Sequence, residues 1–157
     1  MNIRLIVVGK TDIPFVQQGV DEYLGRLKHY VGFELVVIPS LKNVGRMSSG
    51  ELKEKEGDLI LKQTEKADVT ILLDEHGKEY TSVGFSEYLG KQMNAGIKTL
   101  AFVIGGAYGF SPAVHAAANG EISLSRMTFN HQMVRLFFVE QLYRAYTILH
   151  HEKYHNE

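Results

Sequence analysis

Histidines gather toward the C-terminus together with other side chains that can carry acid–base chemistry. Four of the seven histidines fall in the last 27 residues, a segment that holds His131, His150, His151, His155, Arg135, Arg144 and Tyr154. An imidazole changes charge near neutral pH, so it can accept or donate a proton. A guanidinium can stabilise negative charge that develops on a substrate. The clustering favours a polar site formed by the chain end; the alternative is a solvated helix end, where the helix dipole favours cations.

Residues 151–155 read His-Glu-Lys-Tyr-His and match the H-E-x-x-H pattern of zinc hydrolases. On a helix, the two histidines of this pattern share a face and bind zinc, while the glutamate acts as general base. Here no third ligand follows the match, and chain ends fray unless they are held. We therefore expect no metal site, and a terminal zinc hydrolase is kept as a competing interpretation.

A glycine-rich segment, Gly-Gly-Ala-Tyr-Gly at residues 105–109, follows one apolar run and precedes a helix start. Glycine lets a ligand approach backbone N–H groups closely. The spacing differs from the G-x-G-x-x-G dinucleotide fingerprint, and no acidic residue lies about 20 positions further on to hold a ribose. The segment predicts either a ligand-binding loop or a tight turn.

Short apolar runs alternate with longer segments of helical periodicity, a pattern typical of a mostly parallel sheet flanked by helices. Strands are expected at residues 3–8, 33–38, 69–73, 99–104 and 122–125. Helices are expected after an Asp12 cap with Pro14 in the first turn, at 51–66 behind a Ser48–Glu51 capping box, from Ser82 to Gly96 with Met93 inward, from Ser111, and at about 131–150. No repeat or linker interrupts the pattern, so we expect one α/β domain over residues 1–157.

In the expected sheet, the glycine-rich segment lies at the carboxyl end of a strand. Open α/β sheets bind ligands in the loops at the carboxyl ends of their parallel strands. Leu73, Gly105 and Ser125 each mark such an end. This position favours the ligand-binding interpretation of residues 105–109.

The last expected helix is apolar around nearly its whole circumference, whereas one core-facing stripe needs far fewer apolar residues. Burial on two sides suggests a self-complementary partner surface. We therefore predict a symmetric homodimer through this helix. The alternative is a central helix that lies wholly inside one monomer.

Charge is balanced overall but uneven along the chain. Seventeen lysines and arginines face 18 aspartates and glutamates, so no global positive field points to nucleic acid. The net charge is +2 over residues 1–50, −5 over 51–90 and +2 over 91–157. We interpret the acidic helix at 51–66 as a solvated face. The positive segments contain Lys42, Arg46, Arg126, Arg135, Arg144 and Lys153.

Cysteine is absent, which removes disulfides, thiolate zinc sites, iron–sulfur clusters and cysteine nucleophiles. Arg4 interrupts an N-terminal apolar run that is too short for a signal peptide. No segment approaches the roughly 18 apolar residues of a membrane span. We expect a soluble cytoplasmic protein with no membrane partner.

Several segments, spread in order over almost the full length, resemble one protein family. They are Val-Val-Gly-Lys (7–10), Glu-Lys-Glu-Gly (54–57), Leu-Asp and Gly-Lys (73–74, 77–78), Phe-Val-Ile-Gly-Gly with Gly109 (102–106), Leu-Ser through Thr128 to His131, Glu-Gln-Leu-Tyr-Arg-Ala (140–145) and Tyr-His (154–155). These segments are similar to the RlmH family of bacterial ribosomal RNA methyltransferases, within the SPOUT class. The resemblance implies a SPOUT-type α/β fold with a C-terminal trefoil knot, a feature that general topology rules do not predict.

The resemblance also implies an activity. A homodimer would transfer a methyl group from S-adenosylmethionine to N3 of a pseudouridine, in a stem-loop of 23S ribosomal RNA within the assembled ribosome. The implied cofactor contacts are Leu73, Gly105, Leu124, Ser125, Arg126, Met127, Thr128 and Phe129. The sequence departs from the family at Ala107, at Tyr108 and at Asn130, which replaces a common proline before the last helix.

The chemistry of such a transfer suits the residues near the C-terminus. The sulfonium donor is already activated, so the protein has to align the attack and help a weakly acidic N–H lose its proton. His131 or His155 could accept that proton, Arg144 could stabilise charge on the uracil carbonyls, and Tyr154 could stack on the base or hydrogen-bond it. A non-catalytic RNA-binding module is the other competing interpretation. The near-zero net charge predicts weak, salt-sensitive binding to naked RNA.

Overall fold

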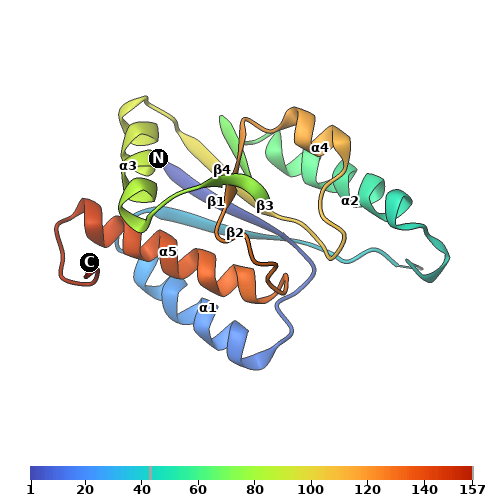
Figure 1. The fold of residues 1–157 in the computed structure, drawn as a ribbon, viewed down its shortest axis with the longest axis horizontal. Helices are drawn as coiled ribbons and strands as arrows, with labels where there is room; N and C mark the ends of the chain where they lie inside the picture. The colour runs from blue at the N-terminus through green and yellow to red at the C-terminus, as the bar shows by residue number, and fades with distance from the viewer. Residues whose placement is uncertain (43, 157) are drawn as a thin grey trace.

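Five parallel strands form one sheet in the order β2-β1-β4-β3-β5. The structure, a computed structural model, describes residues 1–42 and 44–156. The strands are β1 (Asn2–Val8), β2 (Gly32–Ile38), β3 (Val69–Glu79), β4 (Thr99–Ile104) and β5 (Gly120–Ser123) (Figure 1). The predicted α/β class with a parallel sheet is therefore confirmed, whereas the trefoil knot stays a prediction.

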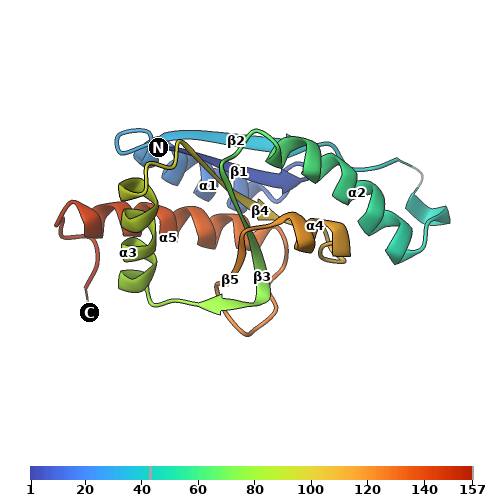
Figure 2. The same cartoon turned by 90° about the horizontal axis from the view of Figure 1, so that it is seen from above.

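Helices cover both faces of the sheet. One layer contains α1 (Pro14–Leu27), α3 (Ser82–Asn94) and α5 (Met133–Leu149); the other contains α2 (Ser49–Thr64) and α4 (Pro112–Ala117) (Figure 2). A short 3-10 helix, η1 (Val44–Arg46), precedes α2. All of the predicted helices are present, with boundaries shifted by a few residues.

The central strands are apolar throughout because both of their faces are buried. Along β1, Ile3, Leu5 and Val7 face the core formed with α1, α3 and α5. Ile6 and Val8 face the smaller core formed with α2 and α4. The strand period of two thus divides one apolar run between two cores.

The helix α5 lies between α1 and α3 (Figures 1 and 2). Phe138, Val139 and Leu142 are fully buried, whereas Phe137 is 41% exposed. The close approach of α1 depends on Gly19, where a Cβ would lie 2.7 Å from Leu136. Neighbours within the chain therefore cover most of this helix, and the homodimer stays a prediction.

Two strand boundaries differ from the predicted ones. The strand β3 continues past Leu73 to Glu79, because the chain bulges and then pairs with β5 again: Ile122 is aligned with Leu73 and with Lys78. Gly77 permits this, since a Cβ there would lie 2.6 Å from the backbone of Glu121. The strand β5 begins and ends two residues earlier than predicted.

Two predicted helix details are wrong. The N-cap of α1 is Ile13 and makes no side-chain cap, while the backbone N–H of Asp12 donates to the side chain of Gln132. Met93 is 44% exposed, because it lies in the last turn of α3, beyond the reach of the core. The predicted caps at Ser48 and Ser111 are confirmed, since each hydroxyl accepts a backbone N–H bond.

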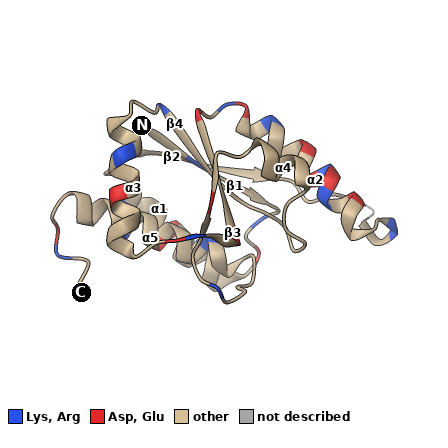
Figure 3. Cartoon of the chain, turned by 45° about the horizontal axis from the view of Figure 1, so that its top comes forward, with Lys and Arg blue, Asp and Glu red and all other residues tan. Residues whose placement is uncertain are grey.

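Two charged residues are buried against expectation. Acidic and basic side chains alternate along α2 (Figure 3), but Glu56 is only 8% exposed. Arg135, counted above in a positive segment, is 1% exposed and donates to the carbonyls of Val8 and Gly9 and to Thr11. These hydrogen bonds hold α5 against the loop after β1, and Arg135 contributes no positive charge to the surface. Within the described residues, no helix is long and apolar enough to cross a membrane.

Candidate functional site

A cavity of about 480 Å³ opens at the carboxyl edge of the sheet, where the bulged part of β3 meets the loops after β4 and β5. Apolar side chains from the ends of these strands form part of its wall, and α2, α4 and α5 contribute Lys53, His115 and Val134. The size falls within the usual range for small-molecule sites. The sequence-based expectation of strand-end loops at this edge is thus confirmed for β4 and β5, whereas Leu73 and the residues that follow it lie within β3.

The glycine-rich segment forms one wall of this cavity. The N–H of Gly109 donates to the carbonyl of Gly106 at 3.2 Å, and Gly109 has a φ of +82°. Tyr108, at the tip of the turn, is 59% exposed. The segment is therefore both a tight turn and a cavity wall, so the two interpretations of the sequence are compatible.

Most of the residues predicted to contact a cofactor line this cavity: Leu73, Gly105, Leu124, Ser125, Met127, Thr128 and Phe129. Arg126 is the exception among the predicted set. It does not line the cavity, and its Nε lies 3.7 Å from the carboxylate of Glu79. The alternation of this loop thus turns one side chain away from the cavity.

Several polar residues of the cavity were not predicted from the sequence. His76 donates its backbone N–H to Asp74 at 2.8 Å, and its Nδ1 lies 3.1 Å from the same carboxylate. Thr128 donates to Glu75 at 2.6 Å, which links the bulged part of β3 to the loop after β5. The sequence signals for this acidic pair were its place directly after an apolar run and, for Asp74, the Leu-Asp segment of the family resemblance.

His115 had no sequence signal, and Glu56 was named only within the Glu-Lys-Glu-Gly segment of the family resemblance. His115 lines the cavity and pairs with Glu121. Glu56 lies behind the glycine-rich turn, where a Cβ on Gly106 would lie 2.7 Å from its carboxylate. Burial raises the pKa of Glu56 above its ordinary value. Neither contact follows from spacing, because each joins elements that only the tertiary fold brings together.

A second polar cluster, here called the tail cluster, consists of Glu140, Arg144, Tyr154 and His155. Arg144 donates to Glu140 through Nε (3.1 Å) and Nη2 (2.5 Å), and its Nη1 lies 3.2 Å from Nδ1 of His155. Tyr154 donates to Glu140 at 3.0 Å, and the Arg144 guanidinium lies 4.8 Å from the centre of its ring. Three of the four predicted catalytic residues therefore meet around one carboxylate.

Burial is the main reason that the pKa of Tyr154 lies above its ordinary value, and hydrogen bonds to Tyr23 and Glu140 add to it. The phenol therefore stays protonated and can donate a hydrogen bond at neutral pH. Glu152 accepts a hydrogen bond from Tyr30 at 2.7 Å, which raises the pKa of that tyrosine to about 12. These contacts fold the chain end back onto α1 and α5.

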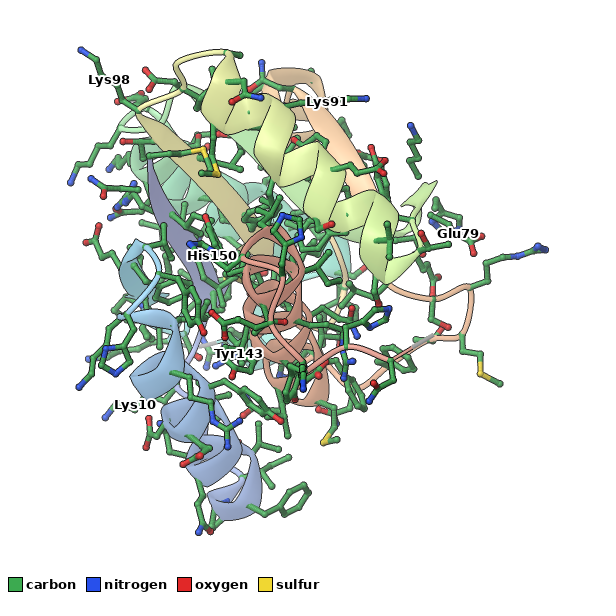
Figure 4. All side chains as sticks on the ribbon, turned by 90° about the vertical axis from the view of Figure 1, so that its left-hand side faces the viewer. Lys10, Glu79, Lys91, Lys98, Tyr143 and His150 are labelled. Carbon is green, nitrogen blue, oxygen red and sulfur yellow. The ribbon has the colours of Figure 1, made fainter. Side chains whose placement is uncertain are left out.

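The H-E-x-x-H match lacks the geometry of a zinc site. The helix α5 ends at Leu149, and His151 has a φ of +57°, so His151 and His155 do not share a helix face. The C-terminal half of α5 points toward the viewer in Figure 4, where Tyr143 lies on the helix and His150 follows its last residue. In the described part of the chain, no group of three or more His, Asp or Glu is arranged to hold a metal ion.

The cavity lies at the N-terminal end of α5, whereas the tail cluster extends from Glu140, in the middle of the helix, to the chain end. Val134 lines the cavity, and Arg144 follows ten residues later, which corresponds to roughly 15 Å along a helix. His131 lies near the cavity end, two residues after Phe129, but is not among the residues that line it. The four predicted catalytic residues are therefore divided between the two ends.

Comparison with known proteins places the chain in a family. Residues 1–155 match the family described as "Predicted SPOUT methyltransferase". Ribosomal RNA large subunit methyltransferase H of Flavobacterium johnsoniae is 57% identical over 157 residues, and that of Parabacteroides distasonis is 56% identical; both alignments cover all of each chain. The chain belongs to the RlmH family of SPOUT methyltransferases.

Solved structures agree on the fold of this SPOUT protein. A probable methylase family protein from Haemophilus influenzae has a TM-score of 0.59 at 12% identity, over 99% of this chain and 71% of that one. A probable methyltransferase from Bordetella pertussis has a TM-score of 0.58 at 14% identity, over 92% and 96%. At these identities the likeness extends to the fold, and the RlmH assignment depends on the full-length relatives.

Proposed function

We propose that this chain is a ribosomal RNA methyltransferase that transfers a methyl group from S-adenosylmethionine to N3 of a pseudouridine. The target lies in a stem-loop of 23S ribosomal RNA within the assembled ribosome, in the cytoplasm. Residues 1–157 act as a single domain. The observation that carries the proposal is the convergence of the β3 bulge and the loops after β4 and β5 on one cavity, in a chain of the RlmH family.

The cavity suits S-adenosylmethionine in shape and chemistry. Leu73, Leu124 and Phe129 would offer apolar surface to the adenine and to the methylene groups beside the sulfonium. Asp74 and Glu75 place negative charge at the same cavity, which favours a ligand with a positive sulfur. When bound there, the cofactor supplies an activated methyl group, whose bond to sulfur breaks as its bond to N3 forms.

The protein's own task is to hold the base and move one proton. A neutral imidazole takes the N3 proton, and either His131 or His155 is proposed for this role. Arg144 stabilises the negative charge that spreads over the carbonyl oxygens as the proton leaves. Tyr154, kept protonated, stacks on the base or donates a hydrogen bond to it.

The distance between the cavity and the tail cluster supports a homodimer through α5. In an antiparallel pair of α5 helices, the tail cluster of one chain lies at the cavity end of its partner. The exposed Phe137 provides apolar surface for such a contact. Mixing a Gly105→Trp chain, blocked at the cavity, with an Arg144→Ala chain tests this arrangement. Restored methylation in the mixture supports a tail that acts on the partner's cavity, and an inactive mixture contradicts it.

The decisive experiment is methylation of ribosomes from a strain that lacks the enzyme, combined with calorimetric titration of S-adenosylmethionine. Saturable cofactor binding and methyl transfer to 23S RNA support the proposal. A non-catalytic RNA-binding module gives neither signal. Methylation of ribosomes that does not depend on the pseudouridine supports the methyltransferase activity but contradicts the proposed target base.

A further inference from the structure

A second cavity, of about 270 Å³, lies between α3 and α5, next to the first. The two cavities share Leu124 and Phe129 as walls. A nucleobase that receives a methyl group has to leave its stack and reach the donor. A site for such a base therefore has to adjoin the cofactor cavity, and this second cavity does.

The lining of the second cavity combines aromatic side chains with one polar edge. Tyr80, Phe85, Phe129 and Phe137 come from four different segments of the chain. Unstacked RNA bases are commonly held by stacking on aromatic rings and read by hydrogen bonds at their edges. The aromatic walls therefore suit a planar base.

The polar edge is formed by Ser82, Glu140 and Gln141. Ser82 donates to Oε1 of Gln141 at 2.8 Å, and Nε2 of Gln141 donates to Oε2 of Glu140 at 3.1 Å. An amide nitrogen has two N–H donors, and each carboxylate or amide oxygen has two lone pairs. The edge thus keeps at least one donor and further acceptors for a ligand, while its own hydrogen bonds fix their orientation.

The same edge leads to the tail cluster, because the other oxygen of Glu140 holds Arg144 and Tyr154. Glu140 therefore belongs both to the polar edge of this cavity and to the tail cluster, whereas in the proposed homodimer the Arg144 that serves the base comes from the partner chain. Pseudouridine carries an N1–H donor that uridine uses for its glycosidic bond. An acceptor at this edge can therefore distinguish the two bases.

We propose that the cavity between α3 and α5 binds the flipped target pyrimidine, and that Gln141 and Glu140 read its edge. This inference rests on the proposed function and adds the location of the substrate base. Sites that hydrogen-bond a substrate N–H discriminate strongly against an analogue that lacks it, because the buried partner is left unpaired. Gln141 is therefore a specificity-determining residue for pseudouridine over uridine.

The test uses Gln141→Met, which keeps the side-chain length but removes its hydrogen bonds. Gln92→Met on α3 is the matched control, since Gln92 lines neither cavity. We expect Gln141→Met to lower single-turnover methylation of pseudouridine-containing ribosomes at least tenfold, and to narrow the preference over uridine-containing ribosomes. Cofactor affinity, measured by calorimetry, should stay within about twofold of wild type. Unchanged methylation and preference overturn the inference.

A second variant distinguishes loss of the proposed base site from loss of the fold. Ser82→Leu fills part of the cavity from α3, and it should abolish methylation while cofactor binding persists. If both variants keep the wild-type preference for pseudouridine over uridine, the inference fails, whether or not they dissociate the protein in sedimentation velocity. If the wild-type protein neither binds the cofactor nor methylates ribosomes, the proposed function fails, which is a separate result.

Discussion

The two ends of α5 present different kinds of site. At its N-terminal end, the cavity is walled by the bulge of β3 and by the loops after β4 and β5, and its shape depends on close approaches such as Glu56 against Gly106. At its C-terminal end, the tail cluster depends on side chains around the Glu140 carboxylate. Backbone walls set the shape of a bound molecule, whereas charged side chains respond to charge that develops during a reaction. We therefore expect substitutions at the cavity to lower cofactor affinity, and substitutions at the tail cluster to lower the rate of methyl transfer.

The largest effect is expected at the tail cluster. Arg144→Ala should lower single-turnover methylation by about 100-fold or more, in the range seen when one stabilising donor is removed from an active site. Cofactor affinity should not change, because Arg144 lies outside the cavity. Lys98→Ala removes the same charge beside the start of β4 (Figure 4) and is the control. A loss of cofactor binding in Arg144→Ala would break the distinction between the two ends.

The reverse pattern is expected at the cavity. Gly106→Ala places a Cβ 2.7 Å from Oε1 of Glu56 and displaces the glycine-rich turn. We expect cofactor affinity to fall about tenfold, or roughly 1.4 kcal/mol, in a calorimetric titration. Gly25→Ala on α1 is the control, since a Cβ there meets nothing within 4 Å. Adding Glu56→Ala to Gly106→Ala should restore affinity; failure of this rescue would show that the contact with Glu56 is not the cause.

The sequence predicts where the cavity lies but not how the segments around it are joined, for a physical reason. Strands at residues 99–104 and 69–73 appear as apolar runs because both faces are buried, and their carboxyl ends then fix where loops gather. The order of the strands in the sheet, the return of β3 to β5 at Gly77 and the pairing of His115 with Glu121 join distant segments, so no local pattern reveals them.

Burial of single charges is equally hidden from the sequence. Arg135 and Arg144 lie on the same helix with similar neighbours in sequence, yet one is a fully buried brace and the other joins a polar cluster. The roles assigned to His131, Arg144, Tyr154 and His155 came from family resemblance and still await the kinetic tests above. Only the structure shows that these four residues are divided between two regions along α5.

A smaller effect should follow from Tyr154→Phe. This substitution removes the hydroxyl that bonds to Glu140 at 3.0 Å and contacts Tyr23 at 3.3 Å. The expected loss is about 1 kcal/mol in the free energy of unfolding, measured by urea denaturation. Tyr108→Phe, at an exposed ring, should leave this free energy unchanged. Equal stability of the two variants would show that the Tyr154 hydroxyl contributes nothing to the fold.

The smallest effect concerns how the two ends respond to pH. Burial raises the pKa of Glu56, so above pH 4.5 the unfolded chain loses this proton while the folded chain still holds it. Stability therefore falls as pH rises from 4.5 through the pKa of the folded state. Glu56→Gln removes this dependence, and it should match wild type at low pH and exceed it at neutral pH by about 1 kcal/mol or less.

Glu140→Gln provides the contrasting variant for the same urea denaturation series. Its carboxylate accepts hydrogen bonds from Arg144 and Tyr154, so the substitution leaves a guanidinium without its charged partner. Stability at neutral pH should therefore fall in Glu140→Gln and rise in Glu56→Gln. If both substitutions change the free energy of unfolding in the same direction, Glu56 is stabilised by a partner as Glu140 is. The distinction between a desolvated carboxylate behind the cavity and a paired carboxylate in the tail cluster then fails.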